Sequence, residues 1–294
     1  MNKKELHIMY HGNCPDGFGA ALTAWTKYGD RASYTPVYHN QPVPDIHSDS
    51  VMMIDFCYPL NEMLELKNKT KHLTVLDHHE GAMPTLEKLK SLPNTSITAD
   101  MTNSGSVLAW KHIYPGIQIP LLLKYIEDRD CHFNKIPDAK VALLWLDTHP
   151  FEFGLWNAFL KFDQTVWHKI IETNGSMLKK YKSMIRKAAS QSVETKLSDY
   201  PAAFCFATEE IASDIASELS QRVNGIGMAL VLQSDGSIKV SLRSNEGLNM
   251  IPIAQALGGN GHAYAAAFKC TPDKLRDLLA GKDLLAEPSF GFAI

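Results

Sequence analysis

Three short apolar runs in the first third of the chain end directly in acidic or imidazole side chains. The runs cover residues 6–10, 51–54 and 73–76. They are followed by His11, by Asp55, and by Asp77, His78 and His79, respectively. Helical patterns lie between them, at residues 18–28 and 60–67, and a third follows them at residues 104–114. This alternation predicts an α/β fold with a mainly parallel sheet and helices on both of its faces.

The polar residues that follow these runs are expected to lie close together. In an open parallel sheet the carboxyl ends of the strands share one edge, and ligands bind at that edge. Asp16 comes shortly after the first run, and Asp128-Arg129-Asp130 follows a further apolar run at residues 121–126. We therefore expect the acids and histidines to converge on this edge, with the fourth cluster closing the group from a neighbouring segment.

A group of Asp and His side chains suits Mn2+, Mg2+, Fe2+ or Zn2+. Crowded carboxylates repel one another unless cations lie between them. Two cations ~3.5 to 4 Å apart can support an in-line displacement at phosphorus. A single acid after a strand is commonly a helix cap, and Asp16 before Gly17 could be a simple turn. The four clusters together favour a metal site and phosphoester hydrolysis.

The pattern of strands and helices begins again after residue 201. Residues 165–196 contain no proline and keep a helical spacing of apolar residues, with Gly175 as an expected interruption, which predicts a linking helix or helix pair. At ~150 residues per domain, a chain of 294 residues allows two domains. We predict a metal-binding domain at 1–165, a linking helix at 166–200 and a smaller α+β domain at 201–294.

Composition restricts the partners and the location. With 29 Lys and Arg against 32 Asp and Glu, the net charge is −3, so the chain has no general basic field to hold a long nucleic acid. We expect no long duplex substrate. No apolar segment approaches the ~18 residues that a membrane span needs, and five scattered cysteines suggest neither a disulfide framework nor a zinc knuckle. A cytoplasmic location fits best.

Five segments, in order along nearly the whole chain, resemble motifs of the DHH phosphoesterase superfamily. LDHHEG at 76–81 resembles the motif that names the family, and HGNCPDGFGAA at 11–21 and MMIDF at 52–56 are similar to its first and second motifs. IEDRD at 126–130 resembles the fourth motif. GGNGHAYAAAF at 258–268 resembles the Gly-Gly-x-Gly-His element of the DHH-associated C-terminal domain.

The resemblance implies a set of site residues. The metal ligands would be His11, Asp16, Asp55, His78 and Asp128, with Asp130 in reserve if Asp128 only caps a helix. Asp55 would bridge two ions and take part in catalysis, His79 would face the scissile phosphate, and Asp77 would support the histidine pair. The divalent cation expected is Mn2+, as one ion or two.

The resemblance also places the nucleotide on the C-terminal domain. Gly258, Gly259 and Gly261 would let the backbone approach a phosphate or base, while His262 and Arg243 would bind phosphate. Arg243 could equally be a surface arginine on a strand. One departure stands out: the first motif usually carries two aspartates two residues apart, whereas Asn13, Cys14 and Pro15 precede a single Asp16 here. Asn13 or Cys14 could fill that metal position, and Cys14 would favour zinc or iron.

The resemblance favours hydrolysis of very short oligonucleotides or small nucleotides to nucleoside monophosphates, as in oligoribonucleases. A cyclic mono- or dinucleotide phosphodiesterase is an alternative, and so is a catalytically impaired nucleotide sensor, because the first motif is reduced. A homodimer is also open. The sequence lacks G-x-S-x-G, P-loop and G-x-G-x-x-G motifs, which disfavours a serine or Rossmann-type enzyme.

Overall fold

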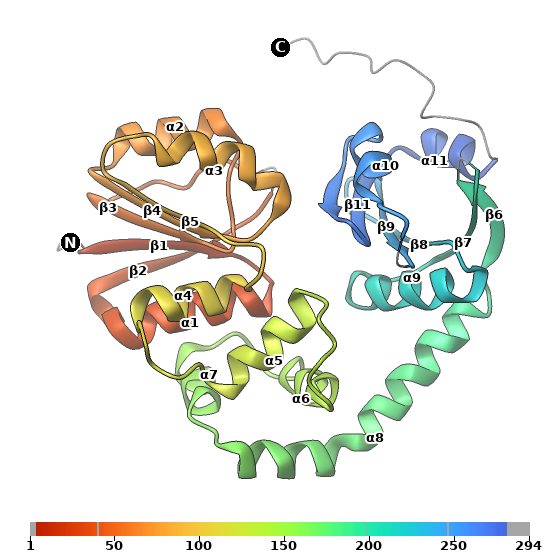
Figure 1. Ribbon diagram of the computed structural model, residues 1–294, viewed down its shortest axis with the longest axis horizontal. Helices are drawn as coiled ribbons and strands as arrows, with labels where there is room; N and C mark the ends of the chain where they lie inside the picture. Colours follow the sequence, from red (N-terminus) through yellow and green to blue (C-terminus); the bar gives the residue numbers. More distant parts are fainter. Residues whose placement is uncertain (1–3, 40, 198, 246, 281–294) are drawn as a thin grey trace. The chain divides into compact units, whose positions relative to one another are not determined.

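The computed structural model describes residues 4–39, 41–197, 199–245 and 247–280 (Figure 1). The chain forms two compact units, Met1–Leu178 and Lys179–Ile294. The end of the predicted C-terminal domain, residues 281–294, lies outside the described residues. None of the described helices is both long enough and apolar enough to cross a membrane.

The first unit is built on a five-stranded sheet in which every strand pair is parallel, as predicted. The strand order is β2-β1-β3-β4-β5. The two edge strands were not predicted, because β2 contains Pro36 and β5 carries few apolar residues. The strands are β1 (Leu6–His11), β2 (Ala32–Val37), β3 (Ser50–Ile54), β4 (His72–Asp77) and β5 (Thr95–Ala99).

Helices cover both faces of this sheet, with α1 and α4 on one side and α2 and α3 on the other (Figure 1). Successive strand residues alternate between the faces: Ile8 and Ile54 pack in the core with α1 and α4, whereas Met9 and Met53 pack in the core with α2 and α3. Four helices and two short 3-10 helices accompany the sheet: α1 (Pro15–Tyr28), η1 (Gly29–Arg31), α2 (Leu60–Lys69), η2 (Glu80–Ala82), α3 (Met83–Lys90) and α4 (Gly105–Ile113).

Three further helices extend the first unit beside α1. They are α5 (Leu121–Asp130), α6 (Ala139–Leu146) and α7 (Phe153–Leu160). Their core is rich in aromatic rings: Phe18 of α1 stacks on Phe153 and makes an edge contact with Trp156, each with ring centroids 4.9 Å apart. This packing fixes α5 against α1, so the acidic end of α5 is held near the start of α1.

The predicted linking helix is longer at its start and shorter at its end than expected. Helix α8 (Gln164–Ala189) runs through Gly175 without a break. The prediction of helix as far as residue 200 was wrong, because strand β6 (Val193–Leu197) pairs with its antiparallel neighbour there. Exposed charged residues at alternate positions of β6 match an edge strand and do not extend the apolar stripe of the helix.

The second unit contains a mixed six-stranded sheet in the order β10-β11-β9-β8-β7-β6. Helix α9 and the end of α8 cover one face, and α10 and α11 cover the other. Thr271 caps α11 as its sequence suggests, accepting a hydrogen bond from the Lys274 amide. The remaining elements are β7 (Tyr200–Phe206), α9 (Glu209–Val223), β8 (Ile226–Leu232), β9 (Ile238–Ser244), α10 (Ile251–Ala256), β10 (Asn260–His262), β11 (Ala265–Cys270) and α11 (Pro272–Leu279).

Candidate metal centre

The carboxyl edge of the parallel sheet gathers acids and histidines from separate segments. His11 ends β1, Asp55 follows β3, and Asp77 ends β4 immediately before His78. Asp16 stands in the first turn of α1, which begins at the same edge. Because neighbouring parallel strands end together, residues far apart in sequence meet here without any long loop.

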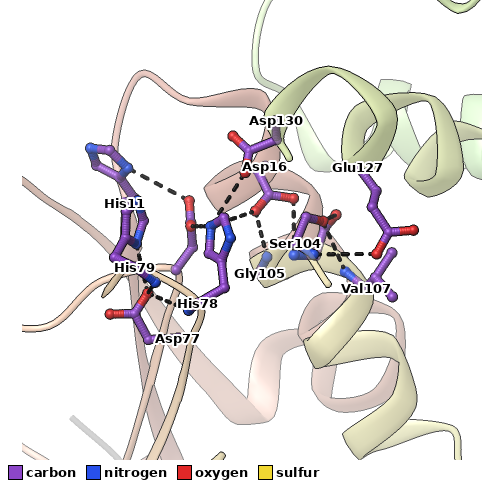
Figure 2. Close-up of polar contacts among 12 residues, drawn as sticks. His11, Asp16, Asp77, His78, His79, Ser104, Gly105, Val107, Glu127 and Asp130 are labelled. Atoms are coloured by element: carbon purple, nitrogen blue, oxygen red, sulfur yellow. Dashed lines mark hydrogen bonds and ion pairs between the residues drawn. The ribbon is translucent and has the colours of Figure 1, made fainter. Parts of the chain in front are cut away.

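His78 lies at the middle of this group, and its side chain is almost fully buried. Its Nε2 atom is 3.1 Å from Asp55 Oδ1, 3.3 Å from Asp130 Oδ2 and 3.9 Å from Asp16 Oδ2 (Figure 2). Burial alone would lower the pKa of His78. The hydrogen bonds with Asp55 and Cys131 and the charge of Asp130 outweigh burial and raise the pKa to about 12.

Asp55 connects His78 with His11. Its Oδ2 atom is 3.6 Å from His11 Nδ1, is fully buried and has no hydrogen-bond partner. Its backbone is held in the left-handed region, φ 59°, while its amide donates to the Leu76 carbonyl. Burial raises the pKa of this carboxyl, but the nearby His11 imidazole and the hydrogen bond with His78 outweigh burial and hold the pKa below its usual range. Asp55 is therefore an ionised, buried carboxylate with an unused oxygen.

The start of α4 holds Asp16 in place. The amides of Gly105 and Ser106 donate to the two oxygens of Asp16, at 2.6 and 3.0 Å (Figure 2). A helix N-terminus favours an anion in this position. Even so, burial, followed by the charges of Asp55 and Asp130, raises the pKa of Asp16 to about 8. The three carboxylates therefore compete for ionisation when no cation is bound.

Asp77 orients the second histidine of the pair. Its Oδ1 atom accepts hydrogen bonds from His79 Nδ1 at 2.7 Å and from the His78 amide at 2.8 Å. Burial lowers the pKa of His79, but the bond with Asp77 outweighs it and raises the pKa to about 9. Asp77 thus fixes the ring orientation of His79 from behind, which matches the supporting position that the sequence suggested.

The structure corrects the choice of acid at the end of α5. Asp128 does not join the group, because its Oδ1 accepts hydrogen bonds from the amides of Lys135 and Ile136, at 2.8 and 3.2 Å. Residues two apart on a helix point in different directions. Asp130, which the sequence analysis held in reserve, points at His78 instead (Figure 2).

The residues present fit a divalent cation. The buried carboxylates of Asp16 and Asp55 and the half-buried carboxylate of Asp130 lie around the His78 imidazole, and the Asp55 Oδ2 atom has no hydrogen-bond partner. A buried anionic oxygen without a partner is costly, and a cation is the usual compensation. His11, Asp16, Asp55, His78 and Asp130 supply the mixed nitrogen and oxygen donors that such ions accept.

Cys131 is a member of the site that sequence reasoning missed. It follows Asp130 directly and forms a hydrogen bond with His78. It also lies in a group with His78 and Asp130 in which one ligand atom of each residue is within 4.8 Å of the others. Its position next to Asp130 in the sequence was the available signal.

In the second unit, Arg243 is anchored on β9 beside α9. Its Nη1 donates to the Leu242 carbonyl at 2.8 Å, and its Nη2 donates to Ser213 Oγ on α9. Burial lowers the pKa of Arg243 to about 10, while the charge of Asp214 acts in the opposite direction. Two hydrogen bonds therefore fix the partly buried guanidinium of Arg243, which is not a mobile surface side chain.

The other predicted substrate residues lie in the neighbouring strands. Ala265 of β11 pairs with Arg243 on one side and with His262 of β10 on the other, so the side chains of Arg243 and His262 share one face of the sheet. An added Cβ at Gly259 or Gly261 would lie 2.0 or 2.4 Å from the backbone of β11. Close packing against β11 therefore explains why both positions are glycine.

Known proteins resemble this chain in sequence and in fold. Residues 200–284 match the model of the DHHA1 domain. An uncharacterized protein of Acanthamoeba polyphaga mimivirus is 30% identical over 293 residues, which cover 90% of this chain and 68% of that protein. This similarity extends through both units.

Two solved structures share the fold at low sequence identity. RecJ from Thermus thermophilus, in complex with Mn2+, is 16% identical with a TM-score of 0.54; the match covers 96% of this chain and 52% of RecJ. The pGpG-specific phosphodiesterase PggH from Vibrio cholerae is 13% identical with a TM-score of 0.50, covering 96% of this chain and 98% of PggH. From its motifs, its DHHA1 match and its relatives, the chain belongs to the DHH phosphoesterase superfamily, a group of phosphoester hydrolases, and has a DHH-associated domain at its C-terminal end.

Proposed function

We propose that the chain is a metal-dependent phosphodiesterase or phosphatase that hydrolyses very short oligonucleotides or small nucleotides to nucleoside monophosphates. The observation that carries the proposal is the convergence on His78 Nε2 of carboxylates from three separate segments, at 3.1 to 3.9 Å. The fold likeness to a pGpG-specific phosphodiesterase supports a small substrate. The net charge of −3 also favours a short substrate over a long polyanion.

His11, Asp16, Asp55, His78 and Asp130 are proposed to hold the divalent cations, with Asp130 in place of Asp128. One carboxylate oxygen of Asp55 faces His11 and the other faces His78, so Asp55 can bridge two ions. Bound cations would supply Lewis acidity and neutralise charge on the phosphoryl oxygens. Mn2+ is the ion we propose for turnover, supported by the Mn2+ present in a structure of RecJ, which shares this fold.

The chain's own groups are proposed to place the reactants and move the protons. Asp55, ionised and buried, accepts a hydrogen bond from the attacking water and so aligns it with phosphorus. His79 is held at Nδ1 by Asp77, so its Nε2 can donate to a nonbridging oxygen as negative charge develops there. The water oxygen forms a new P–O bond and gives up a proton to solvent, while the P–O bond to the leaving alcohol breaks and that oxygen takes up a proton from solvent.

The C-terminal unit is proposed to bind the nucleotide. Arg243 offers a guanidinium whose position is fixed by Ser213, and His262 lies on the same face of the sheet. A guanidinium recognises phosphate through two parallel hydrogen bonds. Such a contact adds to substrate binding away from the reacting phosphorus.

The experiment that tests this function is incubation of the Mn2+-loaded protein with a panel of substrates, with the products identified by mass. The panel contains linear dinucleotides, five-mers, cyclic dinucleotides, adenosine 3′,5′-bisphosphate and cyclic AMP. We expect linear dinucleotides to be converted to nucleoside monophosphates most rapidly. The control is Asp55→Asn, which keeps the size of the side chain but removes its charge.

Each of the other outcomes would assign a different function to the chain. Faster cleavage of cyclic dinucleotides or cyclic AMP than of any linear substrate would assign the cyclic-nucleotide alternative. Binding of a dinucleotide without turnover, in Mn2+ and in other divalent ions, would contradict hydrolysis and identify a nucleotide sensor. Equal turnover by Asp55→Asn would show that the activity comes from a contaminant or from another site.

A further inference from the structure

Two groups of three side chains at the metal centre have the same composition. One contains His11, Cys14 and Asp55, and the other contains His78, Asp130 and Cys131. In each group, one ligand atom of every residue lies within 4.8 Å of the others. Each group therefore offers one imidazole nitrogen, one carboxylate oxygen and one sulfur. Such a set favours borderline cations over hard ones.

The first group also contains an unsatisfied buried atom. Asp55 is 1% exposed, and its Oδ2 atom has no hydrogen-bond partner, although His11 Nδ1 lies 3.6 Å away. Cys14 is at the N-cap position of α1, directly before Pro15. The backbone of Cys14 is extended and is followed by the fixed φ of Pro15, and its sulfur lies within 4.8 Å of a carboxylate oxygen of Asp55.

The other three cysteines have ordinary surroundings. Cys57 donates a hydrogen bond to the Tyr58 carbonyl at 3.3 Å. Cys205 and Cys270 pack in the two cores of the second unit, among apolar side chains. Only Cys14 and Cys131, among the described cysteines, share a group with both a histidine and an aspartate. Their placement is specific to the site.

We propose that Cys14 and Cys131 are metal ligands, one in each group, so that the centre binds Zn2+, Co2+ or Fe2+ with sulfur coordination. On binding, each S–H bond breaks, the sulfur keeps the electron pair to form the bond to the metal, and the proton goes to solvent. The inference rests on the proposed function only in using the same site. It adds a donor type that prefers softer cations to Mn2+ and Mg2+.

The first test is a Co2+ titration of the full-length protein, followed by absorption spectroscopy. Sulfur coordination gives a charge-transfer band in the near ultraviolet, which carboxylate and imidazole ligands do not produce. We expect the band in the wild type, about half of it in Cys14→Ser or Cys131→Ser, and none in the double variant. Cys57→Ser is the matched control and should keep the full band.

The second test measures metal selectivity. Competition between Zn2+ and Mn2+, read as bound metal per chain after dialysis, should favour Zn2+ in the wild type. In Cys14→Asp the preference for Zn2+ over Mn2+ should fall on the order of 10- to 100-fold, because a hard oxygen replaces the sulfur. Far-ultraviolet circular dichroism checks that each variant is folded.

The outcomes separate this inference from the proposed function. A Co2+-loaded wild type without the band overturns the inference, even if the protein hydrolyses dinucleotides. A full band with no turnover on any substrate leaves the inference standing and contradicts the function. If Cys14→Ser keeps the full band, the sulfur of Cys14 is not a ligand and the inference fails for the first group.

Discussion

The two units treat buried polar groups in opposite ways. Among the described residues, the first unit buries Asp16, Asp55, Asp77, His78 and Asp128, whereas the second unit buries only the hydroxyl side chains of Ser220 and Ser241. Both units contain twisted sheets covered by helices on two faces, so the contrast does not come from architecture. The contrast comes from the side chains that lie at one edge of each sheet.

The contrast shows that ionisable side chains suited to metal binding are costly to bury. Burial, followed by the charges of Asp55 and Asp130, raises the pKa of Asp16 to about 8, which means that the ionised forms of these carboxyls disfavour one another. A core of alternating apolar residues, as in the second unit, has no such penalty. A cation bound among these carboxylates would offset their mutual repulsion, so changes in the two units should have different effects.

Asp55→Asn should have the largest effect on hydrolysis. The substitution keeps the shape of the residue, and asparagine tolerates the left-handed backbone, φ 59°, at this position. It removes the negative charge that faces His11 and His78. We therefore expect turnover to fall by more than ~1,000-fold, about 4 kcal/mol in barrier height. Steady-state rates and metal content per chain measure the loss. Retained metal with wild-type rates would contradict the bridging position.

Asp130→Asn and Asp128→Asn form a matched pair on one helix. Both remove one negative charge, but only Asp130 approaches His78. We expect Asp130→Asn to reduce kcat by ~100-fold and Asp128→Asn to change it less than ~3-fold, because asparagine keeps an oxygen for the amides of Lys135 and Ile136. Equal losses in both variants would return Asp128 to the site.

Arg243→Ala tests whether the second unit contributes binding without chemistry. We expect KM to rise ~10-fold, about 1.4 kcal/mol, with kcat changed less than ~3-fold, because the lost contact is away from phosphorus. Lys239→Ala, on the same strand, is the control and should leave KM unchanged. Steady-state kinetics on a dinucleotide measure both values, and an unchanged KM in Arg243→Ala would remove this residue from the nucleotide site.

Gly227→Ala should have the smallest effect on the metal centre. A Cβ at Gly227 would lie 1.8 Å from the Ala216 carbonyl oxygen, so α9 and β8 must separate. We expect the free energy of unfolding of the second unit to fall by about 1 to 3 kcal/mol. The number of cations bound per folded chain should not change. Urea unfolding and metal analysis check both, and a loss of bound metal would show that the two units are coupled.

The sequence was sufficient for the parts of the fold that follow from local pattern. Strands β1, β3 and β4 lie in the middle of their sheet, so their apolar runs are unbroken and easily recognised. The convergence of Asp55 and His78 follows from the same pattern, because parallel strands end at one edge. Edge strands β2, β5 and β6 carry weaker signals and were not predicted.

The remaining parts of the site depend on tertiary contacts that no local pattern encodes. Asp128 and Asp130 are equivalent in sequence, and only the loop amides that Asp128 accepts distinguish them. The support of Asp16 by Gly105 and Ser106 joins residues about ninety positions apart. Cys131 became visible as a site residue only when the end of α5 was placed beside His78.

The centre is assembled from segments that begin at His11 and end at Cys131. During synthesis, the first half of the set is therefore present long before the last ligand leaves the ribosome. At ~5 to 20 residues per second, this interval lasts on the order of ten seconds. A nascent chain in that interval lacks part of the proposed ligand set, so a cation can reach full coordination only after α5 and Cys131 have been synthesised.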